Sequence, residues 1–276
     1  MTILVAGATG NAGAQVVREL LALGSPVRAL TRNAAAARFP AGVEVVEGDL
    51  TRPETIPLEG VTGVHLLATA GDDYAELTTG PELVARVEKA GVRRATVLWS
   101  GSPSPLEEAV TASALEWTVL RPVDFMSNTL VWAESVRREG VVREPFASSR
   151  SALVHEGDIG AVAAAVLVRG GHGGRTYTLT GPEALTVPQQ VATISAAIGR
   201  EIRYVELTEA QAREEMLAQG RPPEVADFLL RWRRDMPAVG YTVDRGVEDV
   251  LGRPARSFAS WARERAGSFV SAGGTR

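Results

Sequence analysis

Cysteine is absent from the chain, and its absence excludes several kinds of site at once. Without a thiol there is no disulfide, no thiolate nucleophile and no cysteine ligand for a metal. The three histidines, His65, His155 and His172, have no spacing that suits a metal either. We therefore expect no metal centre, and the composition gives no sign of an oxidising compartment.

Runs of basic charge and long apolar runs are also missing. The formal net charge is −4 and basic residues form no dense cluster, so neither nucleic acid nor a membrane is expected as a partner. The apolar run over 161–168 is far too short to cross a membrane. The first apolar run stops at Gly7 with no basic segment before it, which argues against a signal peptide. We expect a packed cytoplasmic protein.

Three glycines with the spacing G-x-x-G-x-x-G follow a short apolar run at the start of the chain. They are Gly7, Gly10 and Gly13, and an apolar helical pattern runs on from them to Gly24. The order predicts a strand, a tight turn and a helix whose N-terminus points free N–H groups at a phosphate. Gly7 makes the turn, Gly10 admits a pyrophosphate and Gly13 lets the helix pack on the strand. We predict a bound dinucleotide; the alternative is a glycine turn without a ligand.

Strands and helices alternate through the first half of the chain. Apolar runs predict strands over 27–30, 43–46, 61–67, 95–98 and 117–120, with helices over 34–38, 80–90 and 106–115 between them. Such alternation predicts a doubly wound parallel sheet of Rossmann type, with ligands at the carboxyl ends of its strands.

The second half of the chain is less regular. Its pattern predicts helices over 125–138, 158–168 and 187–198 and from 222, and strands over 176–179 and 202–205. We predict a single domain over 1–276. Residues 1–123 are mainly the Rossmann core, and residues 124–276 are mainly a smaller lobe that covers the substrate, with elements returning to the core.

The end of the second predicted strand indicates which dinucleotide is bound. A carboxylate there would bind the 2′-hydroxyl of NAD, and an arginine would pair with the 2′-phosphate of NADP. No acidic residue occurs between Glu19 and Glu44, and the strand ends at Arg32, with Arg28 and Arg38 near it. NADP(H) is therefore favoured; the alternative is that Arg32 is a solvated surface charge.

Further residues at the strand ends are assigned to the cofactor. Asp49 can accept the adenine amino group, although a role as a helix or turn cap fits equally well. The other residues expected to line the cofactor are Thr9, Asn11, Ala12, Leu50, Ala68, Thr69, Ala70 and Pro122.

Several short motifs together carry a family resemblance. They include Gly-Ala-Thr-Gly-Asn-Ala-Gly (7–13), Thr-Arg-Asn (31–33), Gly-Asp-Leu (48–50), Leu-Glu-Trp-Thr-Val-Leu-Arg-Pro (115–122) and Phe-Met-Ser-Asn (125–128). With these motifs the chain resembles the NmrA-like NAD(P)-binding family of the atypical short-chain dehydrogenase/reductase superfamily. The resemblance implies a Rossmann-type domain, NADP(H), and a C-terminal lobe that closes over the nicotinamide. Members include quinone and dye reductases, plant aromatic-ether reductases and a non-catalytic redox-sensing regulator.

The chain departs from the superfamily in its lysines. Typical short-chain dehydrogenases use Tyr-x-x-x-Lys, in which the lysine lowers the pKa of a proton-donating phenol. Lys89 is the only lysine here, and the residue four positions before it is Ala85. Reduction of an unactivated ketone is therefore not expected, whereas a quinone or conjugated enone needs mainly positioning beside the cofactor.

Two residues are candidates for catalysis. Ser100 could hydrogen-bond a substrate oxygen or be a loop serine tied to the backbone, and Asp124 could relay a proton or cap a helix before Phe125. An aromatic substrate could contact side chains that might equally belong to the core. These are Trp99, Phe125, Met126, Asn128 and Trp132.

These residues together predict an NADPH-dependent oxidoreductase that transfers hydride to a quinone-like or conjugated carbonyl small molecule. The alternative is a non-catalytic NADP-sensing regulator that binds a protein partner, since the Tyr-Lys pair is missing. The sequence leaves the oligomeric state open between monomer and homodimer.

Overall fold

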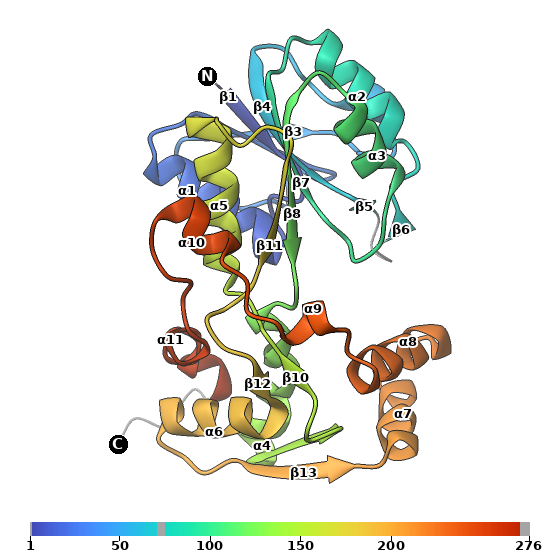
Figure 1. The fold of residues 1–276 in the computed structure, drawn as a ribbon, viewed down its shortest axis with the longest axis vertical. Helices are drawn as coiled ribbons and strands as arrows, with labels where there is room; N and C mark the ends of the chain where they lie inside the picture. Colours follow the sequence, from blue (N-terminus) through green and yellow to red (C-terminus); the bar gives the residue numbers. More distant parts are fainter. Residues whose placement is uncertain (1, 71–74, 271–276) are drawn as a thin grey trace. The chain divides into compact units, whose positions relative to one another are not determined.

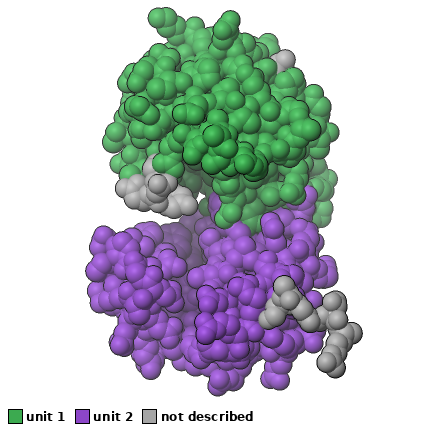
Figure 2. All heavy atoms as spheres, turned by 180° about the vertical axis from the view of Figure 1, so that it is seen from behind, with its two compact units in different colours: residues 1–122, 156–179, 245–254 green, residues 123–155, 180–244, 255–276 purple. Residues whose placement is uncertain are grey.

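The computed structural model describes residues 2–70 and 75–270, and the chain divides into two compact units. Unit 1 consists of Met1–Pro122, Glu156–Leu179 and Arg245–Pro254, drawn in green in Figure 2. Unit 2 consists of Val123–His155, Thr180–Asp244 and Ala255–Arg276, drawn in purple. The chain therefore enters unit 1 three times.

Unit 1 is built on a parallel sheet, which within the described residues has seven strands in the order β11-β8-β7-β4-β1-β2-β3 (Figure 1). Consecutive connections run outward in both directions from β1, so the switch point lies between β1 and β4, where open α/β sheets bind ligands. The doubly wound fold predicted from the sequence is confirmed. The strands are β1 (Thr2–Val5), β2 (Val27–Thr31), β3 (Val43–Glu47), β4 (Val61–Leu67), β7 (Arg94–Leu98), β8 (Glu116–Pro122) and β11 (Arg175–Leu179).

Helices cover both faces of this sheet. α1 (Asn11–Ala22) and α5 (Glu156–Arg169) lie side by side on one face, and α2 (Gly80–Lys89) and α3 (Pro105–Ala112) lie on the other (Figure 1). The central strands are buried between these layers, which explains their nearly continuous apolar runs. α10 (Gly246–Leu251) packs on α5, where Arg253 Nη2 donates to the fully buried carboxylate of Asp158 at 2.7 Å. A short η1 (Pro53–Thr55) and the pair β5 (Thr69–Ala70) and β6 (Ala75–Glu76) complete the unit.

Unit 2 has an apolar core between α6 (Val187–Ile198), α4 (Ala133–Glu139) and α11 (Phe258–Glu264). Trp261 stacks on Phe258 with ring centroids 5.4 Å apart and meets Phe269 edge-on at 6.3 Å. Two strand pairs border this core, β9 (Val141–Pro145) with β13 (Arg203–Leu207) and β10 (Arg150–Ser151) with β12 (Leu185–Thr186). The remaining elements are η2 (Met126–Trp132), η3 (Ala266–Phe269), α7 (Glu209–Ala218), α8 (Pro223–Arg234) and α9 (Ala238–Tyr241).

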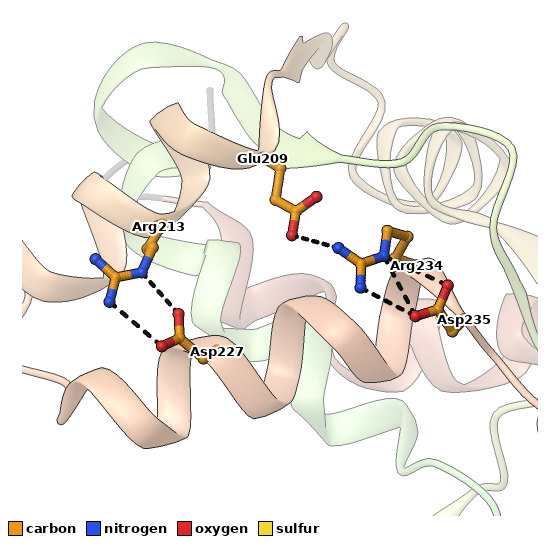
Figure 3. A network of polar contacts seen from close by, with 5 residues as sticks. All are labelled: Glu209, Arg213, Asp227, Arg234 and Asp235. Atoms are coloured by element: carbon orange, nitrogen blue, oxygen red, sulfur yellow. Dashed lines mark hydrogen bonds and ion pairs between the residues drawn. The ribbon is translucent and has the colours of Figure 1, made fainter.

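Ion pairs join α7 and α8, as Figure 3 shows. Arg213 donates from Nε and Nη2 to the two oxygens of Asp227 at 2.7 and 3.3 Å. Arg234 contacts Glu209 at 2.8 Å and Asp235 at 3.1 Å. Few apolar side chains of the two helices are buried, and the ion pairs between them are exposed.

Two predicted helices differ from the sequence-based expectation. The helix expected over 34–38 is a turn, because a segment this short has no apolar face to pack and cannot nucleate. The helix expected over 125–138 is split into the 3₁₀ segment η2 and α4. The strand expected over 176–179 is present as β11, the edge strand of the main sheet of unit 1 beside β8.

Candidate functional site

The glycine turn leads from β1 into α1. Gly7 has φ +60°, a left-handed conformation that suits glycine, and its carbonyl accepts from Gly10 N at 2.9 Å. A Cβ at Gly13 would lie 2.6 Å from the carbonyl carbon of Gly7 and closer still to its oxygen. The predicted roles of Gly7 in turning the chain and of Gly13 in close packing therefore have a direct geometric basis.

The start of α1 fits an anionic ligand. Its N-cap, Gly10, offers no side chain, and the first turn of the helix carries no acidic residue. The partial positive charge of the helix N-terminus is therefore not neutralised by the helix itself. Thr9 and Asn11 are exposed here, and Ala12 is buried against the sheet. These residues fit the pyrophosphate of a dinucleotide.

Arg32 follows β2 directly and lines a hollow of about 210 Å³ in unit 1. The other lining residues are Glu47, Gly48, Asp49, Arg52 and Thr55. The hollow thus holds two arginines and two carboxylates. Arg52 is a residue that the sequence reasoning missed, because it follows the third strand rather than the second.

The other two arginines near Arg32 are used elsewhere. Arg28 donates to Glu44 at 2.9 Å and to the carbonyls of Pro57 and Glu59, also at 2.9 Å. Arg38 donates to carbonyls of its own loop, those of Ala35 and Ala37. Arg32 and Arg52 are the arginines that line this hollow.

Asp49 has the geometry of a turn cap. Its Oδ1 accepts from the backbone N and the hydroxyl of Thr51 at 2.9 and 2.8 Å. The Thr51 N–H is the main reason that the pKa of Asp49 lies below its ordinary value, and the charges of Arg52 and Arg32 add to the effect. Its proposed contact with adenine stays a prediction. Leu50, next to it, is buried and its carbonyl accepts from Thr79.

The remaining cofactor candidates lie near strand ends. Ala68 is buried after β4, and Thr69 and Ala70 form β5, paired with β6. Pro122 ends β8 opposite Leu179 of β11. Small residues at this edge leave room for a ligand.

Trp99 and Ser100 follow β7. The hydroxyl of Ser100 is exposed and has no hydrogen-bond partner among the described residues, so the alternative of a serine tied to the backbone is not seen. Trp99 is partly buried, and the guanidinium of Arg121 lies 5.1 Å from its ring centroid. Arg121 also forms an ion pair with Glu107, and neither of these two residues was singled out from the sequence.

Asp124 lies in unit 2, directly before Phe125 and η2. Its carboxylate accepts from Asn128 Nδ2 at 2.6 Å and from Ser151 Oγ at 3.1 Å. Burial raises the pKa of Asp124 above its ordinary value, against the opposing effects of these two hydrogen bonds and of the Arg233 charge. A carboxyl group with this environment is suited to hold a proton.

The residues expected to contact an aromatic substrate differ in burial. Met126 and Trp132 belong to the core of unit 2, and Trp132 Nε1 donates to Glu144 Oε1 at 2.7 Å. Their burial favours the core alternative over contact with a substrate. Phe125 is partly exposed and Asn128 is exposed, so both stay candidates for substrate contact.

The histidines have structural surroundings. His65 is fully buried and its Nδ1 lies 2.9 Å from Thr96 Oγ1, and burial lowers its pKa to about 4. His155 meets Glu264 at 3.1 Å and His172 meets the hydroxyl of Tyr177 at 2.8 Å. Within the part of the chain that the structure describes, no group of His, Asp and Glu side chains could hold a metal ion, and no helix could cross a membrane.

Comparison with known proteins places this geometry in a family. Residues 1–104 match the model of the NmrA-like family. An NAD(P)H azoreductase of Xenophilus azovorans is 34% identical, over 98% of this chain and 100% of the relative. The (4-alkanoyl-5-oxo-2,5-dihydrofuran-3-yl)methyl phosphate reductase of Streptomyces griseus subsp. griseus is 36% identical, over 97% and 99%.

Among solved structures, the NADPH complex of the quinone oxidoreductase QOR2 from Escherichia coli has the same fold. It matches with a TM-score of 0.77 at 24% identity, over 95% of this chain and 99% of that one. The match over almost the whole length of two relatives above 30% identity extends the assignment beyond the N-terminal segment. The chain belongs to the NmrA-like family of the atypical short-chain dehydrogenase/reductase superfamily.

Proposed function

We propose that this protein is an NADPH-dependent reductase that transfers hydride to a quinone-like or conjugated carbonyl small molecule, and that it acts in the cytoplasm. The observation that carries the proposal is the site in unit 1. There the glycine turn and the start of α1, which has no side-chain cap, suit the pyrophosphate of the dinucleotide. The hollow that Arg32 and Arg52 line suits its 2′-phosphate. The reductase names of the two relatives above 30% identity support the proposal.

The residues of unit 1 account for binding of the cofactor. The N-terminus of α1 and the backbone around Gly10 hold the pyrophosphate, since no side chain or acidic residue competes there. Arg32, joined by Arg52, pairs with the 2′-phosphate, which is the group that separates NADPH from NADH. When bound, NADPH supplies the hydride.

The residues available for chemistry suit an activated acceptor. The chain has no Tyr-x-x-x-Lys pair to drive proton donation. Ser100 has an exposed hydroxyl that can donate to an acceptor oxygen. Asp124, whose pKa is raised by burial, holds a proton at a higher pH than an ordinary carboxyl and can donate it to the oxyanion of the reduced product.

Oxidation of NADPH in the presence of a panel of quinones, enones and azo dyes tests the proposal. We expect turnover above the buffer blank with at least one quinone or azo dye and none with simple ketones. Tight NADPH binding without turnover on any acceptor would overturn the reductase and leave the NADP-sensing alternative. A variant panel of Ser100→Ala and Asp124→Asn then separates substrate binding from proton supply, because only the second should change the pH dependence of kcat.

A further inference from the structure

Three side chains of unit 1 meet where two neighbouring strands end. Trp99 follows β7, Arg121 lies at the carboxyl end of β8, and Glu107 lies in the first turn of α3. The backbone of Trp99 is itself joined to β8, because its N–H donates to Leu120 O at 3.0 Å. In open α/β sheets this edge is where ligands bind.

The guanidinium of Arg121 is held on two sides. Its carbon lies 5.1 Å from the ring centroid of Trp99, within reach of a cation–π interaction, and its Nη2 donates to Glu107 Oε1. Glu107 is itself positioned, since only 11% of its side chain is exposed and its N–H donates to the capping hydroxyl of Ser104 at 3.2 Å. Arg121 therefore presents a fixed orientation rather than a mobile surface charge.

The ion pair between Arg121 and Glu107 is monodentate, with one guanidinium nitrogen contacting one carboxylate oxygen. Glu107 Oε2 and Arg121 Nε are both buried and have no hydrogen-bond partner among the described residues. The pair of Arg213 and Asp227 in Figure 3 is bidentate, with two guanidinium nitrogens contacting the two carboxylate oxygens. Arginine and a carboxylate frequently adopt this geometry. Buried polar groups without partners cost stability. The monodentate pair leaves Glu107 Oε2 and Arg121 Nε in that state, so stability alone would not favour it.

One part of the guanidinium stays available. Nη1 has no partner in the described part of the chain, and 40% of the Arg121 side chain is exposed. Because Glu107 balances the charge of Arg121, the pair as a whole is neutral. A neutral pair with an open N–H donor suits an oxygen on which partial negative charge develops better than it suits a ligand with a full double charge.

We propose that Arg121 is a further catalytic residue, which donates a hydrogen bond to the acceptor oxygen that gains negative charge during reduction. This inference rests on the proposed function. The reduced nicotinamide gives a hydride to the conjugated acceptor, the electron pair of its C=O moves onto the oxygen, and a proton from water or a carboxyl group completes the reduced product. Arg121 contributes a hydrogen bond and is not the source of the proton. Glu107 and Trp99 are positioning residues.

Steady-state kinetics of Arg121→Gln provide the first test. Loss of one donor to a developing oxyanion lowers kcat by about 100- to 1,000-fold in other enzymes, and we expect a loss in that range with NADPH affinity unchanged. The matched control is Arg94→Gln, because Arg94 pairs with Glu116 at 2.9 Å at the opposite ends of the same two strands. Arg94→Gln should reduce stability and leave kcat unchanged. If Arg121→Gln behaves as Arg94→Gln does, the ion pair is structural and the inference is wrong.

The single variant leaves Glu107 without its partner and could lose activity because it folds poorly. A control for folding is therefore needed. The double variant Glu107→Gln with Arg121→Gln removes both charges together, and we expect it to fold and to show the same loss of kcat. In Arg121→Ala, added methylguanidine should restore part of kcat, which it would not do for a residue needed only for folding. Full kcat in the folded double variant would also refute the inference.

A binding experiment without turnover separates the two proposals. 4-Nitrophenol absorbs visible light only as its phenolate, an anion that resembles a quinone after it has gained a hydride and before it has gained a proton. We expect the wild type with NADP⁺ to raise the phenolate fraction at fixed pH and Arg121→Gln not to do so; equal fractions in both would count against Arg121. Wild-type protein with no turnover on any acceptor removes the proposed function, whereas normal turnover in the Arg121 variants removes only this inference.

Discussion

Two glycines of the same turn are predicted to respond in opposite ways to alanine. Gly13 packs against the backbone of Gly7, where an added Cβ would come within 2.6 Å of the carbonyl carbon. Gly10 has φ −81° and ψ 171°, which alanine adopts freely, and its Cβ would meet only the oxygen of Gly7 at 3.3 Å. Gly13→Ala therefore disturbs the protein itself, and Gly10→Ala disturbs mainly the space in front of the helix.

The structure sets the expected magnitudes. Overpacking costs about 1–3 kcal/mol, and overlap with backbone atoms cannot be relieved by rotating a side chain, so Gly13→Ala belongs at the upper end. Alanine in a helix recovers about 1 kcal/mol, which leaves a net loss of about 2 kcal/mol for Gly13→Ala. Gly10→Ala should change stability by less than about 1 kcal/mol but weaken NADPH binding by about tenfold or more, equivalent to about 1.4 kcal/mol.

Urea unfolding followed by circular dichroism, and NADPH titration followed by fluorescence, measure the two effects separately. Gly63→Ala is the control for the substitution itself, because its Cβ would have an ordinary contact at 3.4 Å. Wild-type stability in Gly13→Ala would refute the packing argument. Wild-type NADPH affinity in Gly10→Ala would show that no pyrophosphate approaches that glycine.

Three further predictions test the cofactor, a buried histidine and the α7–α8 pair. Arg32→Glu should weaken NADPH far more than NADH, while Arg38→Glu, in the neighbouring loop, should change neither affinity. The pKa of His65 is lowered to about 4, so stability should be full above pH 6.5 and fall by up to about 3 kcal/mol as pH drops from 6.5 to 4, an effect that urea titrations of His65→Gln should lack. The ion pairs of Arg234 are exposed, so 0.5 M NaCl should speed amide hydrogen exchange in α7 but not in the apolar-packed α6.

Local pattern was enough for the elements that carry strong periodicity. The strand over 61–67 and the helix over 187–198 have the predicted bounds, since both are apolar where they pack. A glycine marks one end of each, Gly60 before the strand and Gly199 after the helix. Pattern failed at residues 34–38, where alanine has high helix propensity but nothing to pack against. It also missed β9, whose buried apolar residues are interrupted by Arg143 and Glu144, and α7, where Ala212 is the buried residue.

The candidate site shows the same division. Spacing and position along the chain singled out the glycine turn and Arg32, because both follow a strand directly in sequence. The surroundings of Asp124 come from Ser151, which lies 27 residues away, so sequence could offer a cap or a proton relay but not choose between them. Arg52 carries no signal of its own, since its role depends on a hollow closed by a different strand.

The sequence by itself determined the parallel fold and the kind of ligand it holds, because strand, turn and helix follow one another over a few residues and their chemistry is local. Tertiary structure alone decided which arginines are free to act. The guanidinium of Arg28 is hydrogen-bonded to Glu44 and to two carbonyls. Arg121 lies beside Trp99 and Glu107, and its Nη1 has no partner in the described part of the chain. Identical side chains acquire different roles because the partners that satisfy their hydrogen bonds come from distant parts of the chain.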